Sequence, residues 1–174
     1  MIEIKDKKDC CGCWACENAC PKHCISMAED KEGFRYPQVN TDSCIDCHLC
    51  EKVCPIINVK PVEEKPQKGY LLQNKDAKVL SESTSGGAYT AIAKYVLKQG
   101  GVVFGAALNE YNEARHIYIE SEDELWKFRN SKYVQSLIGD TYQQAKEFLK
   151  QGRLVCFSGT PCQMEGLVSY LRKP

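Results

Sequence analysis

Short apolar runs separated by polar loops mark the second half of the chain. The runs VVFGAAL (102–108) and HIYIE (116–120) are rich in β-branched and aromatic residues, which predicts two strands. RLVCFSG predicts a buried strand over 153–157, and GYLLQN predicts another over 69–74. Because strands alternate with helical segments, we expect an α/β layer of about four strands.

Apolar residues at helical spacing predict a helix that follows the loop SESTSGG and ends at Gly100. A second helix is expected after Ser121, where Glu124 three residues later completes a capping box. The expected face of the first helix consists of Ala88, Ile92, Tyr95, Val96 and Gln99.

Two more amphipathic segments are predicted helices. The segment 141–152 has Tyr142, Ala145 and Leu149 on one face. The second segment follows Pro161, a residue that suits the first helical turn. Its expected apolar face consists of Met164, Leu167, Val168 and Leu171.

The first part of the chain has a different character, because ten of the twelve cysteines lie between Cys10 and Cys54. Two extended runs around a charged, glycine-containing turn predict a hairpin over 25–40. A stretch rich in proline and charge follows, which is typical of a linker. We therefore expect a cysteine-rich domain at 1–57, a linker at 58–69 and an α/β domain at 70–174.

The cysteines form an internal repeat. CCGCWACENACP and CIDCHLCEKVCP both contain C-x2-C-x2-C-x3-C-P, the bacterial ferredoxin spacing for [4Fe–4S] clusters. Three thiolates at two-residue gaps can wrap a tight loop around one corner of a cubane. The sequence therefore predicts an α+β ferredoxin-like module that holds two [4Fe–4S] clusters.

In two-cluster ferredoxins the fourth cysteine of each motif ligates the other cluster. Applied to this chain, that rule assigns each cluster three cysteines from one motif and one from the other. The first set is Cys10, Cys13, Cys16 and Cys54, and the second set is Cys44, Cys47, Cys50 and Cys20.

Zinc, haem and disulfide chemistry fit the cysteine spacing less well. Zinc ribbons use paired C-x2-C rather than a triple followed by Cys-Pro. CIDCH matches the c-type haem attachment motif, but it lies inside the ferredoxin spacing, and we expect His48 to be a solvated loop residue. A disulfide framework disagrees with the expected compartment. Cys24 is expected to pack beside a cluster. Cys11 is left over, and it could replace Cys10 as a ligand only if the loop slipped to C-x-C, which breaks the match with the second motif.

Composition sets limits on location and partners. The formal net charge is zero, and no basic run indicates nucleic acid. The charged start MIEIKDKKDC has no apolar signal segment, and no apolar run is long enough to span a bilayer. We therefore expect a cytoplasmic protein in which cysteines serve metal or redox chemistry rather than disulfides.

Two glycine-containing loops lead into helices in the second part of the chain. STSGG places hydroxyls and glycines at a helix start, which suits a phosphate but is also common as a local cap. In FSGTPCQ, Cys162 falls in the first helical turn, where a thiolate is favoured as a metal ligand or redox group. Cys156 lies mid-strand and is expected to pack.

The motifs STSGGAYTA (83–91), RNSKYVQS (129–136) and FSGTPCQ (157–163), placed after tandem ferredoxin motifs, resemble the coenzyme F420 hydrogenase/dehydrogenase beta subunit family. The resemblance implies an iron–sulfur flavoprotein that binds FAD. Family members usually continue well past the GTPCQ helix, so the chain is expected to be a fragment and its α/β domain incomplete.

By resemblance, these motifs hold the flavin, and Cys162 and Lys132 are candidate catalytic residues. The implied flavin residues are Ser85, Gly86, Gly87, Thr90, Lys132, Tyr133, Gln135, Ser136, Gly159, Thr160, Pro161, Cys162 and Gln163.

The implied activity is electron transfer between a hydride carrier and the two clusters by way of FAD. The hydride carrier would be a deazaflavin or a nicotinamide, and a redox partner protein or subunit is expected. The alternative is a ferredoxin-type electron carrier that docks to a partner reductase and has no catalytic activity of its own.

Overall fold

The computed structural model describes residues 1–59, 61, 66 and 68–172. Its contacts divide the chain into two units. Unit 1 groups 1–61, 138–146 and 159–174, and unit 2 groups 62–137 and 147–158. The domain bounds expected from the sequence stay a prediction, and much of the expected linker (60, 62–65 and 67) lies outside the described residues.

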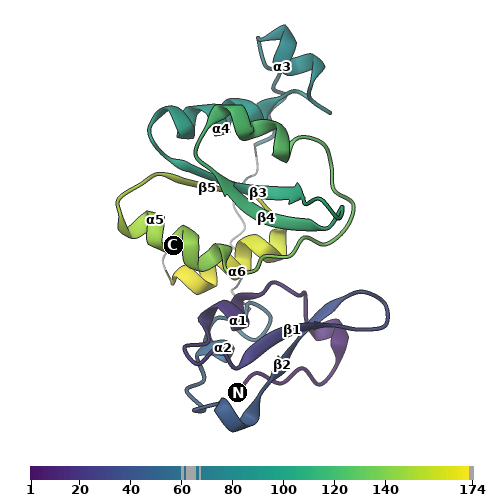
Figure 1. Ribbon diagram of the computed structural model, residues 1–174, viewed down its shortest axis with the longest axis vertical. Helices are drawn as coiled ribbons and strands as arrows, with labels where there is room; N and C mark the ends of the chain where they lie inside the picture. Colours follow the sequence, from purple (N-terminus) through teal and green to yellow (C-terminus); the bar gives the residue numbers. More distant parts are fainter. Residues whose placement is uncertain (60, 62–65, 67, 173–174) are drawn as a thin grey trace. The chain divides into compact units, whose positions relative to one another are not determined.

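The N-terminal part of unit 1 contains the hairpin expected over 25–40. Strands β1 (Ile25–Glu29) and β2 (Arg35–Val39) pair antiparallel, with Ile25 opposite Val39. Two short helices, α1 (Ala15–Ala19) and α2 (Leu49–Lys52), lie beside each other (Figure 1). Two 3-10 turns complete this part, at Lys7–Asp9 and Thr41–Ser43.

Unit 1 also contains segments from the far end of the chain. Helix α5 (Thr141–Lys150) begins in it, and helix α6 (Pro161–Leu171) packs against α1 (Figure 1). Pro161 occupies the first turn of α6 as expected, and the Thr160 N–H donates to Gln163 Oε1 at 2.9 Å. This capping box fixes where α6 begins and places Cys162 in its first turn.

Unit 2 is built on a three-stranded mixed sheet in the order β4-β3-β5. The central strand β3 (Val102–Leu108) pairs antiparallel with β4 (Ala114–Ile119) and parallel with β5 (Val155–Phe157). β3 is buried along nearly its whole length, which explains why its sequence is a continuous apolar run.

Helix α4 (Ala88–Lys98) and a 3-10 helix at Glu122–Phe128, capped by the Ser121 hydroxyl, pack on this sheet and complete the core of unit 2. A short helix, α3 (Ala77–Ser81), precedes α4 in the chain. The core cluster consists of Ala93, Val96, Leu97, Val103, Ala107, Ile119, Leu125 and Phe128.

Two expectations about unit 2 are wrong. Residues 69–74 form no strand, so the sheet has three strands rather than four. Instead, the Asn74 N–H donates to the Gly86 carbonyl at 2.7 Å, which ties this segment to the loop before α4. A side chain at Gly86 would meet the Leu72 carbonyl oxygen at 2.1 Å, so only glycine permits this approach.

Helix faces were also only partly predicted. In α4 the buried residues are Thr90, Ala93, Val96 and Leu97, whereas Ile92 and Tyr95 are exposed. The buried set includes Thr90. Because Thr90 is polar, the spacing of apolar residues does not predict its burial. In α5, Tyr142 and Ala145 are buried as expected.

Candidate functional site

The two cysteine motifs share an unusual backbone conformation. Gly12 and Asp46, at the same position of each repeat, have φ of 62° and 49°. Trp14 and His48, two residues later, have φ of 65° and 57° and directly precede α1 and α2. Non-glycine residues rarely adopt this region. The sequence repeat is therefore also a repeat of backbone structure.

Backbone N–H groups from the second loop and from the N-terminus point at sulfur atoms of the second motif. The Ile2 N–H lies 3.2 Å from Cys50 Sγ, and the Asp46 N–H lies 3.4 Å from Cys44 Sγ. Successive N–H groups in such a conformation form a concave site for an anion. The loops are thus built to stabilise negatively charged sulfur.

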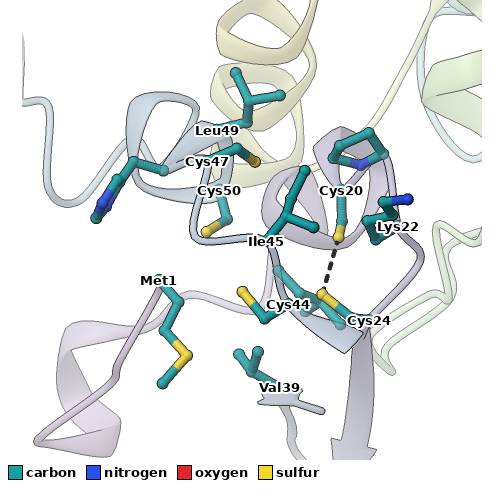
Figure 2. Close-up of a pocket in the computed structure, with 13 residues that line it drawn as sticks. Met1, Cys20, Lys22, Cys24, Val39, Cys44, Ile45, Cys47, Leu49 and Cys50 are labelled. Carbon is teal, nitrogen blue, oxygen red and sulfur yellow. Dashed lines mark hydrogen bonds between the residues drawn. The ribbon is translucent and has the colours of Figure 1, made fainter. Parts of the chain in front are cut away.

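The second predicted set of ligands lines one cavity. This cavity lies between the second motif, the end of α1 and the hairpin, and Figure 2 shows its thiols. Its apolar walls include Ile25 and Val39. The cysteines that line it are Cys20, Cys24, Cys44, Cys47 and Cys50.

Cys24 is the additional thiol in this cavity. Its Sγ lies 3.3 Å from Cys20 Sγ (Figure 2). Burial raises the pKa of Cys20, but hydrogen bonds to its sulfur outweigh burial, so the pKa is lowered overall. The donors are the Cys24 thiol and the backbone N–H groups of Cys24, Lys22 and His23. The hydrogen bond to Cys20, followed by burial, raises the pKa of Cys24 to about 11. Cys20 is therefore the thiol of the pair that ionises first.

The first predicted set also draws on both motifs. The thiol of Cys10 interacts electrostatically with that of Cys54, and Cys16 interacts with both. Burial is the largest cause that raises the pKa of Cys16, to about 12. Because Cys54 belongs to the second motif, the fold brings the fourth cysteine of one repeat to the loop of the other.

Two cysteines outside the predicted sets lie beside Cys13. The thiols of Cys13 and Cys162 are among the groups that lower the pKa of Cys11. The hydrogen bond with Cys13 is the main cause that lowers the pKa of Cys11 to about 6, against the effect of burial. The same bond and burial raise the pKa of Cys13. Cys162 thus lies in unit 1, next to the first motif.

Helix α6 approaches this loop closely. A Cβ atom at Gly166 would lie 3.0 Å from Cys13 Cβ and 3.1 Å from its Sγ. The buried hydroxyl of Tyr142, on α5, donates toward the Cys13 carbonyl at 2.9 Å and the Gln163 carbonyl at 2.7 Å. Tyr142 therefore joins the first motif to the start of α6.

In the part of the chain that the structure describes, no three or more His, Cys, Asp or Glu side chains converge tightly enough for one metal ion. A single zinc ion needs four ligands about 2.0–2.3 Å from its centre. A cubane instead takes one thiolate at each of four irons, so its ligands lie farther apart. Several thiols around one cavity, together with N–H groups aimed at sulfur, fit a cluster better than a single ion.

A pocket lined by several polar residues lies in unit 2 at the start of α4. Ser85, Gly87 and Thr90, three of the residues expected to hold flavin, line it. Arg129 also lines it and forms an ion pair with Glu82, while its buried Nε has no partner among the described residues. The first backbone N–H groups of a helix have no intrahelical acceptor. The pocket therefore offers several donors to an anion.

The other expected flavin residues do not line this pocket. Lys132 Nζ donates to the carbonyls of Lys127 and Arg129, and Tyr133 is 93% exposed. Ser136 is buried and its hydroxyl lies 2.9 Å from His116 Nδ1. Gln135 is exposed, and the loop Gly159–Gln163 belongs to unit 1.

Sequence reasoning missed Tyr142, Gly166 and Arg129 as site residues. Tyr142 was placed only on an apolar helix face, and its hydroxyl bond spans 129 positions of sequence, which no local pattern reveals. Arg129 begins the motif RNSKYVQS and was passed over in favour of the lysine within it.

Comparisons with known proteins agree with both parts of the chain. Residues 9–57 match the 4Fe-4S dicluster domain, and residues 70–141 match the N-terminal region of the coenzyme F420 hydrogenase/dehydrogenase beta subunit. No curated protein matches the chain. Among the described residues, no helix combines the length and apolar character needed to cross a membrane. The chain therefore has a dicluster iron–sulfur domain ahead of a region that matches the N-terminal part of the coenzyme F420 hydrogenase/dehydrogenase beta subunit family.

Proposed function

We propose that this protein is an oxidoreductase that passes electrons between FAD and two [4Fe–4S] clusters. The observation that carries the proposal is the cavity in which Cys20 from the first motif meets Cys44, Cys47 and Cys50 from the second. This is the crossed arrangement of a two-cluster ferredoxin. It supports a ferredoxin-like fold for the cysteine-rich module.

The proposed ligands are the eight cysteines of the two motifs, in the crossed sets given by the sequence. The first set is Cys10, Cys13, Cys16 and Cys54, and the second is Cys44, Cys47, Cys50 and Cys20. The electrostatic contacts of Cys54 with Cys10 and Cys16 support the first set. The shared cavity supports the second.

The clusters supply one-electron transfer when bound, and the protein's own groups stabilise the sulfur ligands. N–H donors, such as those of Ile2 and Asp46, place positive partial charge on the ligand sulfurs. Apolar side chains such as Ile25 and Val39 exclude water from the cavity that contains the second set of ligands. Hydrogen bonds to sulfur and exclusion of solvent are the means by which a protein tunes a cluster's potential.

FAD is proposed for the pocket at the start of α4. Three observations support an anionic group there: the free N–H groups of the helix, the hydroxyl and glycine residues before it, and the buried Nε of Arg129. A hydride carrier, either a deazaflavin or a nicotinamide, is the proposed two-electron substrate. A partner redox subunit in the cytoplasm is the proposed partner.

The test is anaerobic purification followed by metal, sulfide and flavin analysis of the same sample. We expect about eight iron and eight sulfide per chain, absorbance near 400 nm and one FAD released on denaturation. Zinc without iron would reject the clusters. Eight iron without flavin, and without bleaching by NADH, NADPH or reduced deazaflavin, would favour the alternative of a non-enzymatic electron carrier.

A further inference from the structure

We propose that the thiol of Cys24 donates a hydrogen bond to the sulfur of Cys20 and thereby raises the reduction potential of the second cluster, which Cys20 ligates. This inference rests on the proposed function, because it requires the clusters, but it does not depend on FAD. Cys24 is not among the proposed ligands. Its role is to tune the second cluster rather than to hold it.

The two sulfur atoms lie close together in a site that is closed to water. They are 3.3 Å apart, and both line the cavity of the second ligand set (Figure 2). Cys20 is 7% exposed and Cys24 is 8% exposed. A hydrogen bond in such a site of low dielectric constant is electrostatically stronger than the same bond in water.

Coordination of iron decides which of the two thiols donates. A cysteine binds iron as a thiolate, so the sulfur of Cys20 carries no proton when the cluster is bound. The proton between the two sulfurs then belongs to Cys24. Cys20 is therefore the acceptor and Cys24 the donor in the cluster-containing protein.

The backbone holds Cys24 in place on both sides. The chain turns tightly after Cys20, where the His23 N–H donates to the Cys20 carbonyl at 3.2 Å and His23 has φ of 49°. The Asn40 N–H donates to the Cys24 carbonyl at 2.8 Å, and β1 begins at the next residue, Ile25. The thiol of Cys24 is thus positioned by the turn and by the hairpin together.

The second cysteine motif has a different residue at the matching position. Cys24 lies four residues after Cys20, and Asn58 lies four residues after Cys54. The side-chain amide of Asn58 donates to the carbonyls of Glu51 and Cys54, at 2.6 and 2.9 Å. The repeat therefore places a thiol beside the sulfur of one crossed cysteine and a backbone-binding amide after the other. We expect the effect of Cys24 to be confined to one cluster.

The direction of the effect follows from charge. Reduction adds one electron to a cluster, and part of the added negative charge falls on the ligand sulfurs. A hydrogen-bond donor beside a sulfur stabilises that charge, so it favours the reduced form and raises the potential. A typical hydrogen bond changes such an equilibrium about fivefold.

The experiment is a redox titration of the anaerobically purified, cluster-containing protein, followed by electron paramagnetic resonance, with iron analysis of the same sample. Cys24→Ala removes the donor and should keep about eight iron atoms per chain. At a fixed potential, the ratio of reduced to oxidised form should fall about fivefold for one cluster and stay unchanged for the other. Cys24→Ser is the matched variant, because its hydroxyl can still donate, and its potentials should stay close to those of the wild type.

Three results would overturn the inference and leave the proposed function standing. The first is full iron content with both potentials unchanged in Cys24→Ala. The second is an equal fall in Cys24→Ala and Cys24→Ser, which would show that the hydrogen bond does not set the potential. The third is loss of about half the iron from either variant, which would make Cys24 a ligand. Wild-type protein without iron would overturn the proposed function and this inference together.

Discussion

The hydroxyl of Tyr142 lies 2.9 Å from the carbonyl oxygen of Cys13. This buried bond joins helix α5 to the first cysteine motif. Tyr142→Phe removes the donor and leaves the buried carbonyls of Cys13 and Gln163 without it, which costs about 1–2 kcal/mol. We expect the Tm of the cluster-containing protein to fall by about 2–6 °C in scans at one fixed rate.

Tyr111→Phe serves as the control for this change, because Tyr111 is 81% exposed. Removal of a solvated hydroxyl should alter stability by less than about 0.5 kcal/mol. Equal Tm values for the two variants would show that the Tyr142 bond contributes nothing to the module.

Gly166 is expected to be intolerant of even one added carbon. Replacement of a helical glycine by alanine ordinarily stabilises a protein by about 0.5–1 kcal/mol. Here the added Cβ would lie 3.0 Å from Cys13 Cβ and 3.2 Å from its carbonyl oxygen. We expect Gly166→Ala to destabilise the protein by about 1–3 kcal/mol, as overpacking does.

Thermal scans of Gly166→Ala should be run with iron analysis, since the strain falls on the loop of the first motif. Ser169→Ala, on the same helix, adds no atoms and is the matched control. A Gly166→Ala protein more stable than wild type would show that α6 and the loop separate easily.

Cys20 and Cys24 allow a direct test of the crossed ligand assignment. Their sulfurs lie 3.3 Å apart in one cavity, yet the spacing rule makes only Cys20 a ligand. We expect Cys20→Ser to lose about four of eight iron atoms and Cys24→Ser to lose none. The reverse result, measured on anaerobically purified protein, would exchange their roles.

His116 should make the stability of unit 2 depend on pH. Burial lowers the pKa of His116 below 6.5, with a smaller opposing effect from the Ser158 carbonyl, 2.9 Å from Nε2. That carbonyl can only accept, so Nε2 carries the proton, and Nδ1 can accept from the Ser136 hydroxyl. The folded state therefore favours neutral imidazole.

The unfolded chain binds a proton at His116 near its ordinary pKa, whereas the folded chain does so only at lower pH. Stability should therefore be unaffected above about pH 7.5, decrease as the pH falls through 6.5, and level off below the folded pKa. His116→Phe keeps the ring stacking on Phe157, and its stability should no longer decrease between pH 7.5 and the folded pKa of His116. The control His23→Asn changes an exposed histidine and should keep this decrease.

Local chemistry made much of the molecule predictable. Cysteine spacing indicated the clusters. The apolar run 102–108 correctly indicated strand β3, and Pro161 correctly indicated the start of α6. The segment at 69–74 is not a strand, although its apolar residues are of the β-forming type. It has no partner in the sheet β4-β3-β5. Whether a β-type segment becomes a strand depends on neighbours far away in sequence.

The site was predictable where its residues lie close together in the sequence. The hydrogen bond from Tyr142 to Cys13 joins residues 129 positions apart. Such contacts depend on which elements pack together, and one glycine, Gly166, permits the closest approach. Periodicity and spacing contain no information about that packing.

The separation of Cys13 and Tyr142 along the chain also bears on synthesis in the cell. Chains are made from the N-terminus at about 5–20 residues per second, so both cysteine motifs emerge seconds before Tyr142 and α6 exist. During that interval the nascent first motif lacks the Tyr142 hydrogen bond and the cover of α6. The ribosome-bound chain therefore passes through a stage in which the thiols of the first motif are exposed. Oxidants and foreign metals reach these thiols more easily at that stage than in the folded protein.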